Sequence, residues 1–260
     1  MKQKFIAVFL LGVLMATALS AADTFTGRQI AQKMKAANFS NKGLILKGGL
    51  KLMDLKNKKT EQRNFTMLSR KVKGLSRTLF RFTDSTYKGT TFLTIEERND
   101  RTIQYLYMNS IGSPRQVQSS DKEAEFLDTD FSNEDLGGVT LADYTYKRLA
   151  DRKIGNKEFY VIESFPKNKK SKYSRKVIMI DKHNFIPVNV KCYNKQKRLV
   201  KIIKSSHIKK IGGDMYIPFS ITATDLRSRH KTEMRVSEAR EADINRGLFN
   251  KMRMSRPWPY

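Results

Sequence analysis

The chain has 260 residues, of which 51 are Lys or Arg and 25 are Asp or Glu, so its formal charge at pH 7 is +26. A charge of this size attracts nucleic acid, anionic lipid or an acidic protein, and a compositional bias spread over the surface would give the same value. Cys192 is the single cysteine, which excludes a disulfide within the chain and any site built from paired cysteines.

The first residues of the chain have the pattern of a secretory signal peptide. Lys2 and Lys4 precede an apolar run over residues 5–19, and small residues follow up to Ala22. The run is shorter than the ~20 residues of a membrane-spanning helix, so a retained single-pass anchor is the less favoured alternative. We expect residues 1–22 to be cleaved, which lowers the formal charge from +26 to +24, and the mature chain to act in a bacterial periplasm.

Residues 23–260 contain no linker-like stretch and no internal repeat, which predicts a single domain. An amphipathic helix is expected at its start. Thr26 and Gln29 have the spacing of a capping box, and Ile30 and Met34 follow on one face. This helix has to lie with its apolar side on another element.

Short segments with alternating polar and apolar residues follow at hairpin spacing. The first of them has Leu44, Leu46, Leu50 and Leu52 on one face at period two. The expected strands cover residues 43–56, 60–72, 75–82, 90–97, 102–109, 144–149, 159–165, 177–180, 186–193, 199–208, 215–225 and 232–239.

A sheet of so many strands has to curl. We therefore predict a mainly β (α+β) fold, a single incomplete antiparallel β-barrel of roughly ten to twelve strands, with an N-terminal helix and a short central helix as its lid or plug. The pattern leaves open whether the concave face encloses a cavity or is filled by side chains.

The predicted central helix lies in residues 126–136, where the period of the strands is interrupted. Thr129 or Ser132 can cap a helical turn, and Asp135 follows Ser132 at capping-box spacing. The segment also carries a cluster of acidic residues, namely Asp128, Asp130, Glu134 and Asp135. In a strongly basic chain, this cluster predicts an internal counter-charge, and the alternative is a solvated connecting turn.

The same segment carries a family resemblance. Its sequence, Phe126-Leu-Asp-Thr-Asp-Phe-Ser-Asn-Glu-Asp-Leu136, resembles the signature Phe-x-Gly-Thr-Asp-Phe-Ser-Tyr-Glu-Asp-Leu of the periplasmic outer-membrane lipoprotein-sorting protein family, with Asp128 in place of Gly and Asn133 in place of Tyr. Weaker matches precede and follow it in the family's order, including Gly89-Thr-x-Phe92-Leu93, Gln104-Tyr105-Leu106-Tyr107 and Asp143-Tyr144-x-Tyr146.

The resemblance implies a LolA/LolB-like fold, which is an incomplete antiparallel β-barrel wrapped on a helical lid, with an apolar cavity for acyl chains. It implies a periplasmic carrier or chaperone that binds the acyl chains of a lipid or lipoprotein for transport between the inner and outer membranes. An inner-membrane transporter, an outer-membrane acceptor and an anionic membrane surface are then the candidate partners.

Three groups of candidate site residues follow from this interpretation. The expected cavity wall consists of Phe92, Ile103, Tyr105 and Tyr107. The expected lid consists of Ile30, Met34, Phe131 and Leu136. The expected contact for anionic head groups or for a partner protein consists of Lys167, Lys169, Lys170 and Lys172, in a predicted hairpin tip over residues 167–176.

The sequence does not indicate an enzyme. It has no Gly-x-Ser-x-Gly elbow, no His-Glu-x-x-His and no Walker loop, so we expect no catalytic residue, metal or cofactor. Cys192 follows three apolar residues at period two, which predicts a small core residue rather than a nucleophile. Nucleic acid fits the basic composition, but export argues against it. The remaining alternative is a non-enzymatic periplasmic adaptor with a filled barrel, which binds a membrane transporter or envelope protein through its basic surface.

Overall fold

The computed structural model describes residues 23–37, 42–84, 86–99, 101–137, 141–169, 171–213 and 215–260. The expected signal peptide, residues 1–22, and the candidate contact residue Lys170 lie outside these ranges. Among the described residues, no helix has the length and apolar character needed to cross a membrane.

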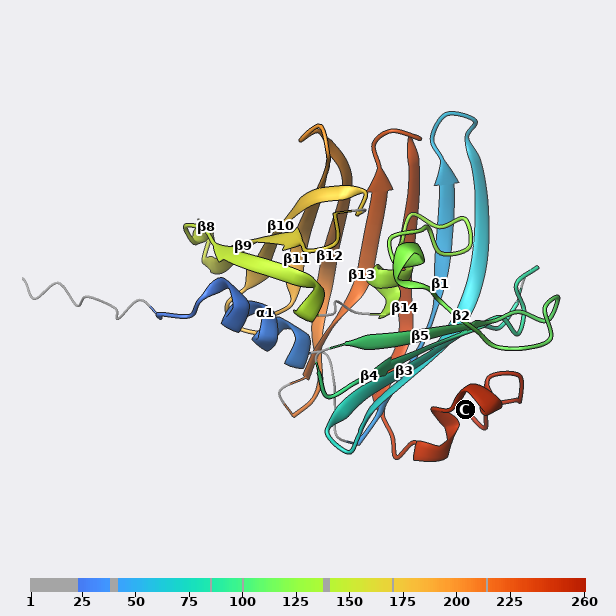
Figure 1. Ribbon diagram of the computed structural model, residues 1–260. Helices are drawn as coiled ribbons and strands as arrows, with labels where there is room; N and C mark the ends of the chain where they lie inside the picture. Colours follow the sequence, from blue (N-terminus) through green and yellow to red (C-terminus); the bar gives the residue numbers. More distant parts are fainter. Residues whose placement is uncertain are drawn as a thin grey trace, which may run out of the picture.

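One antiparallel sheet of 14 strands forms most of the molecule (Figure 1). Its order is β6-β5-β4-β3-β2-β1-β14-β13-β12-β11-β10-β9-β7, and β8 pairs with β9. The strands are β1 Leu44–Asp54, β2 Lys59–Val72, β3 Leu75–Phe82, β4 Thr91–Glu96, β5 Thr102–Tyr107, β6 Arg115–Gln116, β7 Tyr144–Arg148, β8 Arg152–Ile154, β9 Lys157–Pro166, β10 Tyr173–Asp181, β11 Pro187–Asn194, β12 Leu199–Gly212, β13 Met215–Asp225 and β14 His230–Glu241.

The sheet curves, but its edge strands β6 and β7 do not pair, so the barrel is incomplete, as predicted (Figure 1). The first strand, β1, pairs with the last, β14, in the middle of this open sheet. Twelve of the strands correspond to the expected segments. The other two, β6 and β8, have 2 and 3 residues and are too short to show a period.

The helices are short. They are α1 (Gly27–Ala36), α2 (Asn133–Gly137) and the 3₁₀ turns η1 (Ser119–Asp121), η2 (Leu141–Asp143), η3 (Arg246–Leu248) and η4 (Lys251–Arg253). The predicted capping box of the first helix is present, because Thr26 and Gln29 exchange both hydrogen bonds between side chain and backbone.

The two faces of the sheet are covered by different parts of the chain. We call the inner face the one on which α1 and residues 125–137, the central segment, pack. Both lie on the same face, because the in-register neighbours Ile203, Val190 and Ile178 connect the two clusters across β12, β11 and β10.

The outer face is covered by the end of the chain. Residues 242–260 pack Ile244, Leu248, Phe249 and Met254 against Ile45, Leu68, Leu79 and Leu93. Arg81 of β3 connects the sheet to this covering segment. Its guanidinium carbon lies 4.1 Å from the centre of the Trp258 ring, and Nη2 donates a hydrogen bond to the Met254 carbonyl at 2.5 Å.

Candidate functional site on the inner face

The central segment covers an aromatic surface on the inner face. Phe126 and Phe131 are buried there, and the Phe126 ring lies 5.2 Å from Phe92 and 6.0 Å from both Phe80 and Phe82, centroid to centroid. These distances are typical of favourable aromatic pairs. The apolar interior of the barrel is therefore filled in this structure by side chains of the protein itself.

A tight loop at the start of the segment aims these rings at the sheet. The Phe126 N–H donates to the Phe131 carbonyl at 2.8 Å, and Thr129 Oγ1 donates to the Phe126 carbonyl at 2.7 Å. Asp128 has a φ of 62°, in the left-handed region that favours glycine. Glycine, which the resembled signature has at this position, adopts this conformation without strain. Asp is among the residues that tolerate this conformation, and its carboxylate accepts a hydrogen bond from the Tyr87 hydroxyl at 2.7 Å.

Two buried ion pairs hold the far end of the segment. Lys201 Nζ lies 2.6 Å from Asp135 Oδ2, and Lys176 Nζ lies 3.1 Å from Glu134 Oε2. The Tyr144 hydroxyl donates to the same Glu134 oxygen at 2.8 Å. The prediction of an internal counter-charge is confirmed for Glu134 and Asp135, whereas Asp128 is exposed. Lys176 also corrects the predicted hairpin tip, because it belongs to β10 and is buried.

A third polar contact lies between these ends. The Asp130 carboxylate accepts a hydrogen bond from Thr232 Oγ1 at 2.7 Å and lies 2.7 Å from His230 Nδ1. The predicted cap at Ser132 is also present, since Ser132 and Asp135 exchange hydrogen bonds between side chain and backbone in both directions.

The buried charges shift one another's protonation. Burial by itself would raise the pKa of Asp135, but Lys201, Lys176 and hydrogen bonds lower it to about 2. Burial by itself would lower the pKa of Lys176, but Glu134 and its other neighbours hold it well above the usual value. Both groups are charged at neutral pH. Cys192 lies beside them, and burial raises the pKa of its thiol to about 11, which makes it a poor nucleophile.

A polar pocket of 760 Å³ lies beside the central segment, where the two edges of the sheet approach each other. We call it the seam pocket. Its lining includes Gln104 of β5, Glu134 of α2 and Tyr144 of β7. Gln104 donates through Nε2 to the Asn133 carbonyl at 2.8 Å. Within the described part of the chain, Gln104 Oε1 and Glu134 Oε1 are buried and accept no hydrogen bond, so two acceptors next to the pocket are left without a donor.

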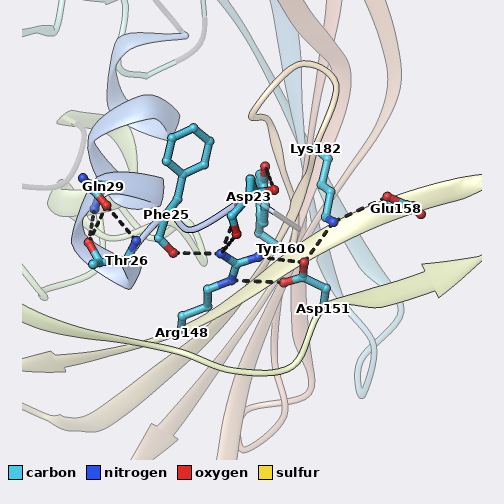
Figure 2. Close-up of polar contacts among 9 residues, drawn as sticks. All are labelled: Asp23, Phe25, Thr26, Gln29, Arg148, Asp151, Glu158, Tyr160 and Lys182. Carbon is cyan, nitrogen blue, oxygen red and sulfur yellow. Dashed lines mark hydrogen bonds and ion pairs between the residues drawn. The ribbon is translucent and has the colours of Figure 1, made fainter. Parts of the chain in front are cut away.

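The second covering element, α1, is fixed at its start by Arg148 (Figure 2). Arg148 Nη1 donates to the Asp23 carboxylate at 3.0 Å and to the Phe25 carbonyl at 2.8 Å, and the Tyr160 hydroxyl donates to Asp23 at 2.7 Å. Asp151 orients the guanidinium from its other side at 2.8 Å. Burial opposes ionisation of Asp23, but these donors outweigh it and lower the pKa of its carboxyl.

The candidate wall residues do not line one surface. Phe92 packs on the inner face, whereas Tyr105 and Tyr107 pack on the outer face beside the end of the chain. Ile103 alternates with Gln104 and so shares the face of the two tyrosines. The residue of β5 that joins Phe92 on the inner face is its cross-strand partner Leu106. The expectation of a common wall is therefore wrong, because odd-numbered residues of this strand point outward.

The candidate lid residues all lie on the inner face, in two clusters. Ile30 and Met34 pack with Ile162 and Ile178, while Phe131 and the partly buried Leu136 pack in the aromatic cluster.

Among the basic contact residues, Lys167 and Lys169 are exposed and Lys172 is half-buried, with its ammonium 5.3 Å from the centre of the Tyr173 ring.

The sequence interpretation missed the inner-face residues Phe65, Phe80, Phe82 and Phe126. Phe80 and Phe82 stand two residues apart on β3, so strand periodicity could have placed them on one face.

Among the described residues, no group of three or more His, Cys, Asp or Glu is arranged to hold a metal ion.

The architecture is that of the LolA-like proteins, a wide open barrel with helical elements on its inner face. A domain named for outer membrane lipoprotein sorting, from Vibrio parahaemolyticus, has a TM-score of 0.79 and 24% identity, with 88% of this chain and 98% of that chain covered. A DUF1329 family protein from Desulfovibrio piger has a TM-score of 0.77 and 22% identity, with 88% and 97% covered. A LolA superfamily protein from Nitrosomonas europaea has a TM-score of 0.67 and 18% identity, with 88% and 99% covered.

These similarities confirm the predicted resemblance at the level of the fold. A family model that is described as like an uncharacterized protein matches residues 74–256, which is more than half of the chain. The chain belongs to this family. No curated protein matches the sequence.

Proposed function

We propose that this protein is a non-enzymatic periplasmic carrier that binds the acyl chains of a lipid or lipoprotein against the inner face of its sheet. The observation that carries the proposal is the aromatic surface beneath the central segment. Phe65, Phe80, Phe82 and Phe92 form a continuous apolar patch, and the cover over it is a separate segment of chain rather than a further strand. In this proposal residues 1–22 are the cleaved signal peptide and residues 23–260 form one LolA-like domain.

The contacts of the central segment suit a removable cover. Its two phenylalanines supply apolar burial, and its acidic side chains are held by Lys176, Lys201 and His230. Polar contacts of this kind are strong only in their correct geometry, so the segment has one well-defined closed position. Opening exposes the aromatic patch to water and breaks these ion pairs. The burial of an incoming acyl chain has to offset this loss of free energy.

The magnitudes permit such an exchange. Each methylene moved out of water contributes about 0.8 kcal/mol, whereas exposing a buried Phe side chain costs about 1.5–3 kcal/mol. An acyl chain that takes the places of Phe126 and Phe131 therefore offsets their exposure after roughly four to eight methylenes. The seam pocket lies next to the same segment and offers polar groups for the head of such a ligand.

The filled interior favours a second candidate, the non-enzymatic adaptor that binds a transporter or envelope protein through its basic surface. In that case the packing of Phe126 on Phe80, Phe82 and Phe92 is permanent. The two candidates differ in one measurable property, which is whether the native protein admits an apolar ligand.

Two measurements on the purified full-length mature protein test this difference. Native mass spectrometry with organic extraction should detect a co-purified lipid. A naphthalene sulfonate dye should bind the native protein at about one site and be displaced by fatty acid or lysolipid. If the dye binds only on partial unfolding, and no lipid is extracted, the carrier proposal fails and the adaptor is favoured.

A pair of matched variants locates the site. Phe126→Ala removes a ring from the inner face, whereas Phe249→Ala removes an equally buried ring from the outer face. Both should lower stability to a similar degree, since both leave a cavity of the same nominal size. Only Phe126→Ala should increase the affinity for lysolipid. Equal affinities in the two variants would contradict an acyl site beneath the central segment.

A further inference from the structure

Three hairpin turns project from the same end of the barrel (Figure 1). They connect β1 to β2 at residues 55–58, β11 to β12 at residues 195–198 and β13 to β14 at residues 226–229. A row of cross-strand pairs joins the strands just below the turns, and it consists of Lys201, Asp225, His230, Asp54 and Lys59. We call this surface the hairpin-tip end.

Two large apolar side chains are exposed at this end. Leu55 is 54% exposed and Leu226 is 44% exposed, and each is the first residue of its turn. The Leu55 N–H donates to the Arg229 carbonyl of the neighbouring turn at 3.0 Å, and the Leu226 N–H donates to the Val200 carbonyl at the start of β12 at 2.9 Å. The two leucines therefore stand on neighbouring tips.

Basic residues surround the leucines. The three turns carry Lys56, Lys58, Lys195, Lys197, Arg198, Arg227 and Arg229. Arg227 is neutralised by Asp225 at 2.6 Å. Among the described residues, none of the other six has an acidic partner in an ion pair. The end of the molecule thus presents two apolar side chains among six basic side chains that form no ion pair with a described residue, above the carboxylates of Asp54 and Asp225.

One basic residue in each turn has a left-handed backbone conformation. Lys58, Lys197 and Arg229 have φ values of 56°, 60° and 56°, one in each turn. This left-handed region favours glycine and is strained for a long side chain. Each turn therefore carries a basic residue at a position where glycine folds with less strain, so its charge can be removed by substitution with glycine without destabilising the turn.

We propose that the hairpin-tip end docks onto an anionic lipid surface. The basic side chains contact the anionic head groups, and Leu55 and Leu226 enter the apolar boundary below them. Charge complementarity favours this partner, because six basic residues suit an anionic surface rather than an uncharged apolar ligand. The two exposed leucines favour a lipid surface over a purely electrostatic partner, because they can enter its apolar boundary.

The docking end lies next to the cover of the proposed acyl site. Lys201 and His230 belong to the row below the turns, and they hold Asp135 and Asp130 of the central segment. This inference deepens the proposed function and rests on it for its purpose, since a carrier has to meet a membrane. The docking itself is measurable without any acyl ligand.

The test uses the mature protein and vesicles of equal parts phosphatidylglycerol and phosphatidylcholine, with pure phosphatidylcholine vesicles for comparison. The wild type should sediment with the anionic vesicles only, and less so as salt is raised. The variant Lys58→Gly/Lys197→Gly/Arg229→Gly should bind on the order of 100-fold more weakly, at about fivefold for each charge. Its urea midpoint should be unchanged or higher, because glycine relieves the three strained turns.

The chain provides a matched control at the opposite end of β2. Lys73 has a φ of 53° in the turn between β2 and β3, so Lys73→Gly removes one charge from an equivalent backbone conformation. Lys58→Gly should weaken vesicle binding about fivefold and Lys73→Gly should not. Equal losses in the two variants, or full binding by the triple variant, would overturn the proposal.

Insertion of the leucines has its own readout. Leu226→Cys can be labelled with an environment-sensitive dye, because the native Cys192 is buried. Emission should shift to the blue on anionic vesicles, while a label at Ile154→Cys, an exposed residue at the end of β8, should not shift. No shift at residue 226 would overturn insertion. Failure of dye displacement by lysolipid, with docking intact, would instead reject the carrier function alone.

Discussion

Lys201 and Asp135 form a buried ion pair between β12 and the central segment, with 2.6 Å between Nζ and Oδ2. The two residues are 66 positions apart in the sequence. Removing both charges from water carries a large cost, which their attraction repays only in good geometry. Ser132 supplies part of that geometry, because its N–H donates to the same carboxylate oxygen at 2.8 Å.

Loss of one partner of this pair should be strongly destabilising. Lys201→Met leaves Asp135 buried beside Lys176 alone, so we expect the free energy of unfolding to fall by about 3 kcal/mol. Urea unfolding measures this value. The double variant Lys201→Met/Asp135→Asn should be less destabilised than the sum of the two single variants, since it buries no uncompensated charge. Additive losses would show that the pair is not coupled.

The same carboxylate predicts a pH dependence. The pKa of Asp135 is lowered from 3.8 to about 2, so its contribution is fully present above about pH 4 and is lost as the pH falls through 2. The contribution is on the order of 2 kcal/mol. Unfolding measured between pH 5 and pH 2 should therefore show a shallower loss for Asp135→Asn than for the wild type. Parallel curves would mean that the Asp135 carboxyl has an ordinary pKa.

The clamp at the start of α1 predicts a local effect. Arg148→Met removes the donors to Asp23 and Phe25, so we expect a loss of about 1–3 kcal/mol and faster amide exchange in α1, with exchange in β1 to β5 unchanged. Hydrogen exchange with mass spectrometry resolves the two regions. Lys182→Met is the control, because Lys182 contacts Asp151 but neither Asp23 nor Phe25.

The backbone of α1 lies very close to β7 at Gly27, so helix propensity predicts the wrong sign for the effect of an alanine there on stability. A Cβ at Gly27 would lie 2.8 Å from the Arg148 backbone nitrogen and 2.9 Å from the Lys147 carbonyl carbon. Gly27→Ala should therefore destabilise the protein by roughly 1–3 kcal/mol, although alanine is the better helix former by about 1 kcal/mol. Gln32→Ala, on the exposed side of the helix, should be nearly neutral by thermal unfolding. A stabilised Gly27→Ala variant would mean that α1 can move away from β7 at little cost.

Local signals in the sequence predicted much of this fold. The capping box at Thr26, the period-two face of Leu44 to Leu52 and the cap at Ser132 each depend on residues close together in the chain, and each is present. The curled antiparallel sheet followed from the number of such strands. The acidic central segment was also recognisable as a counter-charge, because acidic clusters are rare in so basic a chain.

The tertiary structure alone decided which partners these elements have. Alternation on β5 predicts that Tyr105 and Tyr107 share a face. The residues that cover this face come from 242–260, and their sequence shows no periodic pattern from which the contact could be predicted. The burial of Lys176 likewise depends on Glu134, which is distant in sequence. Periodicity states which residues lie together on a strand. Only long-range packing decides which of the two faces becomes the interior, because both faces of this sheet are apolar and each is covered by a different part of the chain.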